Sequence, residues 1–302
     1  MKQVTVTVPA TSANLGPGFD CLGVAWQLYN RFCWRREPSG LSVTVRGEGA
    51  AKIPANEHNL AIQAAERLFA LVGQRPSGLS LIQDNHIPAG SGLGSSATAV
   101  IGGLLGANGL LDNPLDRAEL LALAAAIEGH ADNVAPALYG GLTLVVGDEP
   151  DAGWLVEHLP VVDLTAVIIL PEFDLATTTA RAALPLQVPL GDAVFNLSRL
   201  GLLLPALASG DYTRLALAMA DRLHQPYRLP LIPGMPAAFT AVRDAGAAAV
   251  ALSGAGPSLV AFAPDHHELI GKAGQAAFAA VGLTSRVYQL AIDHQGSRVQ
   301  WL

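Results

Sequence analysis

The chain has 302 residues, of which 51% are hydrophobic and 14% are charged, and its formal net charge is −7 at pH 7. This composition excludes an intrinsically disordered chain and, at roughly 150 residues per domain, predicts two globular domains. The acidic balance, without any cluster of Lys and Arg, argues against a nucleic-acid-binding face, because phosphate backbones are held by grouped basic side chains.

The N-terminal segment predicts strands. Residues 4–8 alternate valine with threonine, which is a strand pattern that we expect to end at Pro9. A second apolar stretch covers residues 19–34, and residues 41–45 alternate again and predict a further strand.

The rest of the first half predicts a mixture of helices and strands around a glycine-rich loop. Apolar residues recur at helical spacing over 61–72, with Asn59 as a natural N-cap. A strand at 79–83 then leads into the loop Pro88–Gly94, and we expect a helix to begin at Ser95 or Ser96. Further predicted elements are helices over 117–127 and 131–138 and a strand over 141–146.

The turn-rich segment Gly147–Gly153 is the expected domain boundary, which predicts an N-terminal domain over residues 1–150 and a C-terminal domain over 151–302. The second half predicts strands at 166–170, 248–252, 259–262 and 285–290, and helices at 193–208, 236–245 and 265–280. Helices and strands alternate without a strict parallel rhythm, which favours an α+β fold over a doubly wound sheet.

The cysteines and the apolar stretches indicate a cytoplasmic protein. Cys21 and Cys33 lack the spacing of a metal site, and the N-terminus is unlike a secretory signal, so we expect reduced thiols. The most apolar stretch, Ala97–Leu111, contains Asn108 and several glycines and is too short and too polar to cross a membrane.

The segment PAGSGLGSSAT, Pro88–Thr98, is the most informative for chemistry. Closely spaced glycines let backbone N–H groups approach an anion, and the following helix points its positive end at the same place. The spacing is GxGxG, which is neither the lysine-containing P-loop nor the dinucleotide motif, and an ordinary strand-to-helix turn is the alternative. Because a helix end alone contributes only about 0.3 to 2 kcal/mol toward several phosphate charges, a lysine-free loop predicts Mg²⁺ as the neutraliser.

Three further segments join this loop: PATSANLGPGFDCLG (Pro9–Gly23), IEGHADNVAPALYGG (Ile127–Gly141) and LSGAGPSLVAF (Leu252–Phe262). In this order and spacing, the four segments resemble the GHMP kinase superfamily over nearly the whole chain. Within that superfamily, the segments at Pro9 and Ile127 resemble homoserine kinases. Mevalonate and galactose kinases usually carry a lysine or a GEH-type sequence in the first segment, and this chain has neither.

The resemblance implies a two-domain α+β GHMP kinase fold, with a left-handed βαβ unit around an N-terminal phosphate loop and a ferredoxin-like C-terminal domain. It implies ATP-dependent phosphorylation of the side-chain hydroxyl of L-homoserine, a step toward threonine, with Mg²⁺ as cofactor and a homodimer as the assembly. The residues expected at ATP are Asn59, close to the adenine, and Pro88, Ala89, Gly90, Ser91, Gly92, Leu93, Gly94, Ser95, Ser96, Ala97 and Thr98.

The family pattern also implies metal and acceptor residues. Ser96 and Glu128 are expected to hold Mg²⁺, although Glu128 is also consistent with a solvated helix end. The residues expected around homoserine are Asn14, Asp20, His130, Arg181 and Arg228. Asp and Arg are fitting partners for an ammonium and a carboxylate, while a surface arginine is the alternative for each of the two arginines.

The presence of a general base stays open at this point. Asp132 occupies the place where related kinases put a catalytic aspartate, and we expect Asp132 and Asn133 to shape the site around a positioned hydroxyl. His130 and Asp132 could instead form a hydrolase pair, but no GxSxG segment accompanies them. Two other functions remain: a kinase for another small alcohol, and a non-catalytic nucleotide or metabolite sensor on the same fold.

Overall fold

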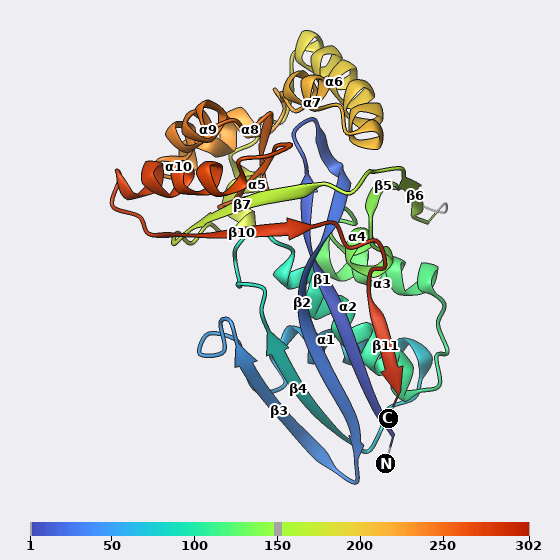
Figure 1. The fold of residues 1–302 in the computed structure, drawn as a ribbon. Helices are drawn as coiled ribbons and strands as arrows, with labels where there is room; N and C mark the ends of the chain where they lie inside the picture. Colours follow the sequence, from blue (N-terminus) through green and yellow to red (C-terminus); the bar gives the residue numbers. More distant parts are fainter. Residues whose placement is uncertain (1, 148–152, 302) are drawn as a thin grey trace.

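The computed structural model describes residues 2–147 and 153–301, so the predicted boundary between residues 150 and 151 lies outside the described residues. The fold is α+β, as predicted, and is built on two sheets (Figure 1). The strands of the first sheet are β1 (Gln3–Asn14), β2 (Gly18–Glu37), β3 (Gly40–Gly47), β4 (Gly78–Asn85), β5 (Leu142–Val146), β6 (Leu155–Leu159) and β11 (Arg298–Trp301). Their order is β11-β1-β2-β4-β3, with β5 paired to β2 and β6 paired to β5.

The prediction that the first strand ends at Pro9 was wrong, because β1 continues to Asn14. Pro9 lies at a shift of the register with β2, between Pro9 and Ala10. A proline has no N–H to donate to a ladder, but a bulge tolerates it without ending the strand. The second half of β1 therefore extends to Asn14, at the start of the turn that joins β1 to β2.

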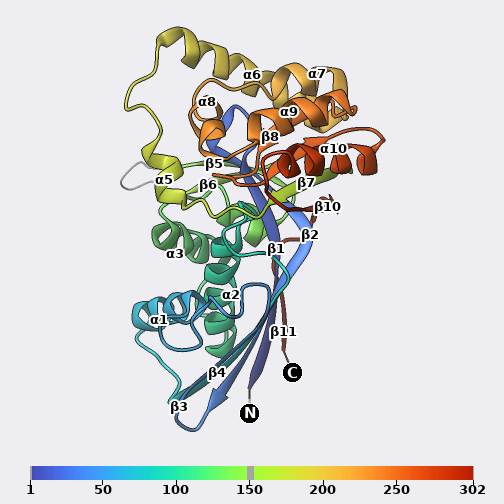
Figure 2. The same ribbon diagram turned by 90° about the vertical axis from the view of Figure 1, so that its left-hand side faces the viewer.

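The helices of the first half of the chain pack on one face of this sheet, as Figure 2 shows for α1, α2 and α3. They are α1 (Leu60–Val72), α2 (Ser95–Leu110), α3 (Arg117–Glu128) and α4 (Val134–Tyr139). Helix α2 is apolar all round and is buried along almost its whole length, as expected for a central core helix. The predicted N-cap is confirmed, because Asn59 Oδ1 accepts a hydrogen bond from the Ala61 N–H. The parallel strands β3 and β4, joined by α1, form the βαβ unit, and its predicted left-handedness stays a prediction.

The second sheet has the ferredoxin-like arrangement that was predicted. Its strands are β7 (Thr165–Pro171), β8 (Ala249–Leu252), β9 (Leu259–Phe262) and β10 (Ser285–Ala291). They pair antiparallel in the order β10-β7-β9-β8. Helices α9 (Met235–Asp244) and α10 (His267–Ala279) cover one face, while α6 (Leu190–Ser209), α7 (Tyr212–Ala218) and the inner end of β2 cover the other. Because both faces are covered, β8 and β9 are buried throughout.

Several short elements were not predicted: β6, β11, α7, α5 (Thr177–Ala182) and α8 (Gln225–Arg228). Strands β6 and β11 both come from the second half of the chain, yet they join the first sheet. The division into residues 1–150 and 151–302 stays a prediction.

Within the described residues, α6 is the one helix that is long and apolar enough to cross a membrane, by length and composition alone. Its mean hydropathy over 18 residues is 1.2, and only 22% of that window is buried. The buried edge of α6, with Asn196, Leu203 and Leu207, packs on the rest of the protein.

Candidate active site

Two of the other three sequence segments are hydrogen-bonded to the glycine-rich loop. The Thr11 N–H of β1 donates to Leu93 O (3.1 Å), which joins the first segment to the loop. From the segment after β8, Ser253 Oγ donates to Gly92 O (2.6 Å) and Ser258 Oγ donates to Ser91 O (2.7 Å). The loop is therefore held on both sides by chain that is distant in the sequence.

Two glycines of the loop are required by this close packing. Gly92 has φ +77°, and a Cβ there would lie 2.4 Å from Ser253 O and 2.7 Å from Gly256 O. Gly94 has φ +68°, and a Cβ there would lie 2.0 Å from Thr11 Oγ1. Only glycine combines this left-handed backbone with so close an approach.

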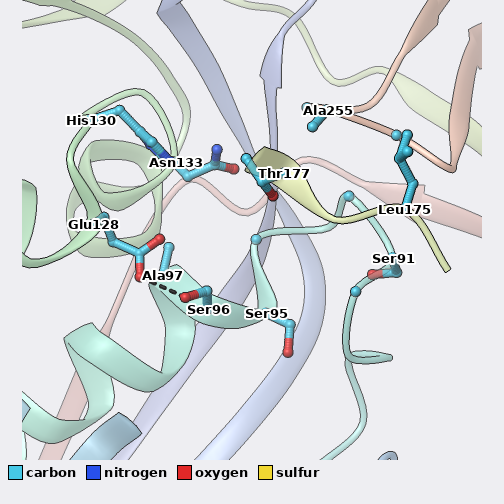
Figure 3. Close-up of a pocket in the computed structure, with 15 residues that line it drawn as sticks. Ser91, Ser95, Ser96, Ala97, Glu128, His130, Asn133, Leu175, Thr177 and Ala255 are labelled. Carbon is cyan, nitrogen blue, oxygen red and sulfur yellow. Dashed lines mark hydrogen bonds between the residues drawn. The ribbon is translucent and has the colours of Figure 1, made fainter. Parts of the chain in front are cut away.

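The loop ends at the N-terminus of α2, with Gly94 as the N-cap. The N–H groups of Ser95, Ser96 and Ala97 have no intrahelical acceptors, and the helix dipole places its positive end there. These three residues line a cavity of about 130 Å³ together with Glu128, Asn133 and the Gly254–Gly256 segment (Figure 3). A helix start of this kind, after a glycine-rich loop, can bind an anion through main-chain N–H groups, and we call it the anion cradle. Leu93 and Thr98 are fully buried, so their side chains pack in the interior and do not face the cavity.

A second cavity of about 270 Å³ adjoins the first and shares Gly90, Ser95 and Ser96 with it. Its other walls include Ile53, Pro54, Asn59, Leu60, Gln83, Ala89 and Ala99. The Asn59 amide is fully engaged, because Oδ1 accepts from Ala61 N–H while Nδ2 donates to Pro54 O and Gln83 Oε1. Asn59 thus shapes this wall. Pro88 lines a third cavity, of about 400 Å³, with Glu48 and Arg286.

Ser96 and Glu128, the two predicted metal ligands, are in contact: Ser96 Oγ donates to Glu128 Oε1 at 2.6 Å (Figure 3). They come from different helices, the start of α2 and the end of α3. Burial raises the pKa of the Glu128 carboxyl, while the hydrogen bond from Ser96 acts in the opposite sense. A hydroxyl and a carboxylate oxygen side by side are the hard ligands that Mg²⁺ prefers, so this pair fits the ion.

His130 and Asn133 line the same cavity, and the buried Asp132 contacts His130. His130 Nδ1 lies 2.9 Å from Asp132 Oδ1, and Asp132 is only 3% exposed. This contact raises the pKa of His130, against the effect of burial. Asn133 is oriented by Thr11, whose Oγ1 donates to Asn133 Oδ1 at 2.8 Å.

Three of the predicted acceptor residues are joined by hydrogen bonds. Arg181 makes a bidentate ion pair with Asp20, at 2.8 and 2.9 Å. The Asp20 N–H donates to Asn14 Oδ1 (2.9 Å), and Asn14 Nδ2 donates to Gly254 O (2.9 Å). Because Gly254 lines the 130 Å³ cavity, this cluster lies beside the anion cradle.

Arg228 is buried, with 1% of its surface exposed, so the surface-arginine alternative is wrong for this residue. Its guanidinium donates to Gly254 O (3.3 Å) and Ala180 O (3.4 Å), and burial lowers its pKa. In the part of the chain that the structure describes, no carboxylate lies within ion-pair distance of Arg228. A desolvated guanidinium without a counter-ion in direct contact is costly, which is the arrangement expected where a ligand supplies the anion.

The sequence reasoning missed Phe19, which lies between the two arginines. Its ring centroid is 5.8 Å from the Arg181 guanidinium and 5.2 Å from that of Arg228. The ring also stacks on His224, with centroids 5.2 Å apart. The sequence signal that could have identified it is an aromatic ring in a glycine- and proline-rich turn, next to Asp20.

Comparisons with known proteins agree with this geometry. Residues 59–141 match the model of the GHMP kinases N terminal domain, and residues 203–280 match that of the GHMP kinases C terminal domain. A homoserine kinase of Moorella thermoacetica is 47% identical over 97% of this chain and 99% of its own length. A homoserine kinase of Thermosynechococcus vestitus is also 47% identical, over 97% of this chain and 98% of its own length. The crystal structure of a homoserine kinase from Cytophaga hutchinsonii superposes with a TM-score of 0.88 at 34% identity, covering 99% of this chain and 97% of that one.

The chain therefore belongs to the GHMP kinases. Within that superfamily it belongs to the homoserine kinase family, which its relatives of 43 to 47% identity over almost the whole length define.

Proposed function

We propose that the chain transfers the terminal phosphate of ATP to the side-chain hydroxyl of L-homoserine. The observation that carries this proposal is the buried Arg228, which has no carboxylate partner among the described residues and bonds to Gly254 at the edge of the anion cradle. A guanidinium placed there fits the carboxylate of an amino acid. The Asp20 carboxylate and its partner Arg181, in the same cluster, suit the ammonium group and a second contact with the carboxylate.

The nucleotide would lie across the two adjoining cavities. The 270 Å³ cavity, with apolar walls from Ile53, Leu60 and Ala99, suits the adenine ring. The phosphates would then reach the main-chain N–H groups from Gly90 to Ala97. ATP as the phosphate donor also follows from the kinase family to which the chain belongs.

Mg²⁺ would be held by Ser96 Oγ and Glu128 Oε1, which are already adjacent. When bound, the ion would neutralise charge on the phosphates and on the transferring group. The loop between Pro88 and Gly94 contains no basic side chain, so this loop itself offers only N–H groups and the helix end for that purpose.

The transfer would be an in-line displacement. The homoserine hydroxyl oxygen attacks the γ-phosphorus and forms a new P–O bond, while the bond from the γ-phosphorus to the β,γ-bridging oxygen breaks and ADP leaves with the electron pair. The hydroxyl proton is lost to water or to Asp132, whose Oδ1 lies 2.9 Å from His130 Nδ1. A loose transition state requires little deprotonation of the attacking oxygen, so positioning by Asp132 and Asn133 suffices without a committed base.

The assembly proposed is a homodimer. A stripe on α6 supports it: Leu190, Val194 and Leu197 are 80%, 55% and 70% exposed and share one helix face. Wild-type protein should sediment as a dimer, and Leu197→Glu should shift it to a monomer, whereas Leu71→Glu, at a leucine of α1 that is 63% exposed, should not. A monomeric wild type would reject this part of the proposal.

A cytoplasmic location is likewise proposed, with the free thiols of Cys21 and Cys33 as support. No nucleic acid or membrane is proposed as a partner.

A coupled ADP-release assay with Mg-ATP tests the function. L-Homoserine, mevalonate, galactose and shikimate should be compared, together with 3-aminopropan-1-ol, which keeps the hydroxyl and the amine but lacks the carboxylate. Turnover with L-homoserine and at least about 100-fold weaker kcat/KM with the amino alcohol are expected from the loss of a paired, desolvated charge. Turnover with another alcohol alone would favour a different small-alcohol kinase, and ATP binding without any turnover would favour the sensor.

A further inference from the structure

The turn that precedes α8 is anchored by a fully buried carboxylate, Asp221. Its oxygens accept four hydrogen bonds: from the N–H groups of Leu223 (2.9 Å), His224 (3.0 Å) and Gln225 (2.6 Å), and from Asn196 Nδ2 of α6 (2.7 Å). These four bonds satisfy both oxygens of the buried side chain. The backbone from which His224 and Arg228 project is therefore held firmly against α6.

The side chain of His224 is completely buried, and its two ring nitrogens face different partners. Nε2 lies 2.7 Å from Gly16 O and 3.5 Å from Asp221 Oδ2, whereas Nδ1 lies 3.4 Å from Arg228 Nη1. A carbonyl oxygen can only accept and a guanidinium can only donate, so Nε2 carries the hydrogen and Nδ1 is the acceptor. The ring is thus the neutral Nε2–H tautomer, and burial, which lowers the pKa of His224, acts in the same direction.

The His224 ring contacts the Gly16–Asp20 turn a second time, through Phe19. The His224 and Phe19 rings stack at 5.2 Å with an interplanar angle of 24°. Phe19 in turn lies under the guanidinium of Arg228. His224 accordingly connects the Gly16–Asp20 turn and the buried arginine by two independent contacts.

We infer that His224 is a positioning residue of the acceptor site, which acts by tying the Gly16–Asp20 turn to Arg228 so that the guanidinium stays aimed at the carboxylate of the acceptor. This inference rests on the proposed function, because it assumes an amino acid as acceptor. It assigns to Asp221 a supporting role, since that carboxylate fixes the backbone of His224.

Three variants separate the contacts of the ring. His224→Asn keeps an acceptor near the position of Nδ1, His224→Gln keeps a donor near the position of Nε2, and His224→Leu removes both. His267→Gln is a matched control, because His267 Nε2 also bonds to a backbone carbonyl, Ala263 O at 3.0 Å, but on α10. Steady-state kinetics should vary homoserine and ATP separately, and thermal unfolding should establish that each variant is folded.

We expect His224→Leu and His224→Gln to raise KM for homoserine about tenfold, as the loss of a hydrogen bond to a charged group predicts, while KM for ATP changes less than about twofold. His224→Asn should recover most of this loss, and His267→Gln should match the wild type. With 3-aminopropan-1-ol the wild type and all variants should have the same KM, because Arg228 has no carboxylate to bind.

Two results would overturn the inference while leaving the proposed function intact: equal changes in the KM values for homoserine and ATP, or His224→Asn no better than His224→Leu. If His224→Leu does not fold, the comparison of His224→Asn with His224→Gln decides alone. A wild type that releases no ADP with homoserine would instead refute the proposed function, and with it the acceptor on which the inference depends.

Discussion

The docking of the glycine loop on the segment after β8 can be tested with one pair of substitutions, Gly92→Ala and Gly90→Ala. Both glycines have left-handed backbones, at φ +77° and φ +68°. An added Cβ at Gly92 would lie 2.4 Å from Ser253 O, whereas at Gly90 it would meet no atom of the described residues within 4 Å. The pair therefore separates the cost of the backbone conformation from the cost of the close approach.

The expected magnitudes follow from these contacts. Alanine in a left-handed conformation costs about 1 to 2 kcal/mol, and the smaller entropy of the unfolded chain returns about 0.4 to 1 kcal/mol, so Gly90→Ala should lose about 1 kcal/mol of stability. In Gly92→Ala the loop must also move away by roughly 1 Å to restore ordinary van der Waals contact. That shift breaks the bonds from Ser253 Oγ and Ser258 Oγ to the loop carbonyls, at about 1 kcal/mol each, which brings the loss to about 3 kcal/mol.

Thermal unfolding without nucleotide is the direct assay. At about 2 to 4 °C per kcal/mol for a chain of this size, Tm should fall by about 2 to 4 °C in Gly90→Ala and by about 6 to 12 °C in Gly92→Ala. KM for ATP should rise in Gly92→Ala, because the displaced loop carries the N–H groups of the cradle. Equal Tm values for the two variants would refute the view that the loop is held in place by the Ser253–Ser258 segment.

Three further predictions concern titration and metal binding. Glu128→Gln should raise the Mg²⁺ concentration for half-maximal rate about 10- to 100-fold with little change in Tm, and an unchanged Mg²⁺ dependence would remove Glu128 from the metal site. Asp132 raises the pKa of His130 in the folded state, whereas the pKa expected for His130 in the unfolded chain is 6.5. The stability that this contact contributes is therefore fully present below pH 6.5 and is lost as the pH rises through the folded pKa. The difference in Tm between wild type and His130→Gln should thus be largest near pH 5.5 and shrink toward pH 8.5, and a difference that grows with pH would contradict it. Burial raises the pKa of the Cys21 thiol to about 11, so iodoacetamide at pH 8 should modify it roughly 200-fold more slowly than a free thiol with a pKa of about 8.5. Mass spectrometry of the labelled peptide measures this rate, and labelling at the rate of a free thiol would disprove the prediction.

The parts of the fold that the sequence predicted are those whose signals are local. Helix α1 has an apolar face, and Asn59 as its cap; the loop before α2 has three glycines at alternate positions. Such patterns depend on neighbouring residues and need no knowledge of the remaining chain. The same holds for the buried strands β8 and β9, which read as continuous apolar runs.

What could not be predicted depends on partners distant in the sequence. Strand β11 has four residues and exists because it pairs with β1 across the whole length of the chain. The two arginines of the acceptor cluster had the same surface alternative, yet Arg181 is exposed and paired with Asp20, while Arg228 is buried with no carboxylate partner among the described residues. Only the packing around Phe19 and Gly254 distinguishes them, and no local pattern encodes that packing.

The segment Asn14–Asp20, which carries acceptor residues, shows why a functional site is the least predictable part of such a chain. Asn14, Leu15 and Asp20 all have positive φ, at 71°, 39° and 56°, although none is a glycine. Each such residue costs of the order of 1 kcal/mol or more, and leucine is among the residues least suited to it. The turn persists because Asn14 bonds to both Asp20 and Gly254, and because His224 holds Gly16 from below. The strained conformation includes Asp20, whose carboxylate pairs with Arg181, so these contacts preserve the geometry of the acceptor site at the expense of stability.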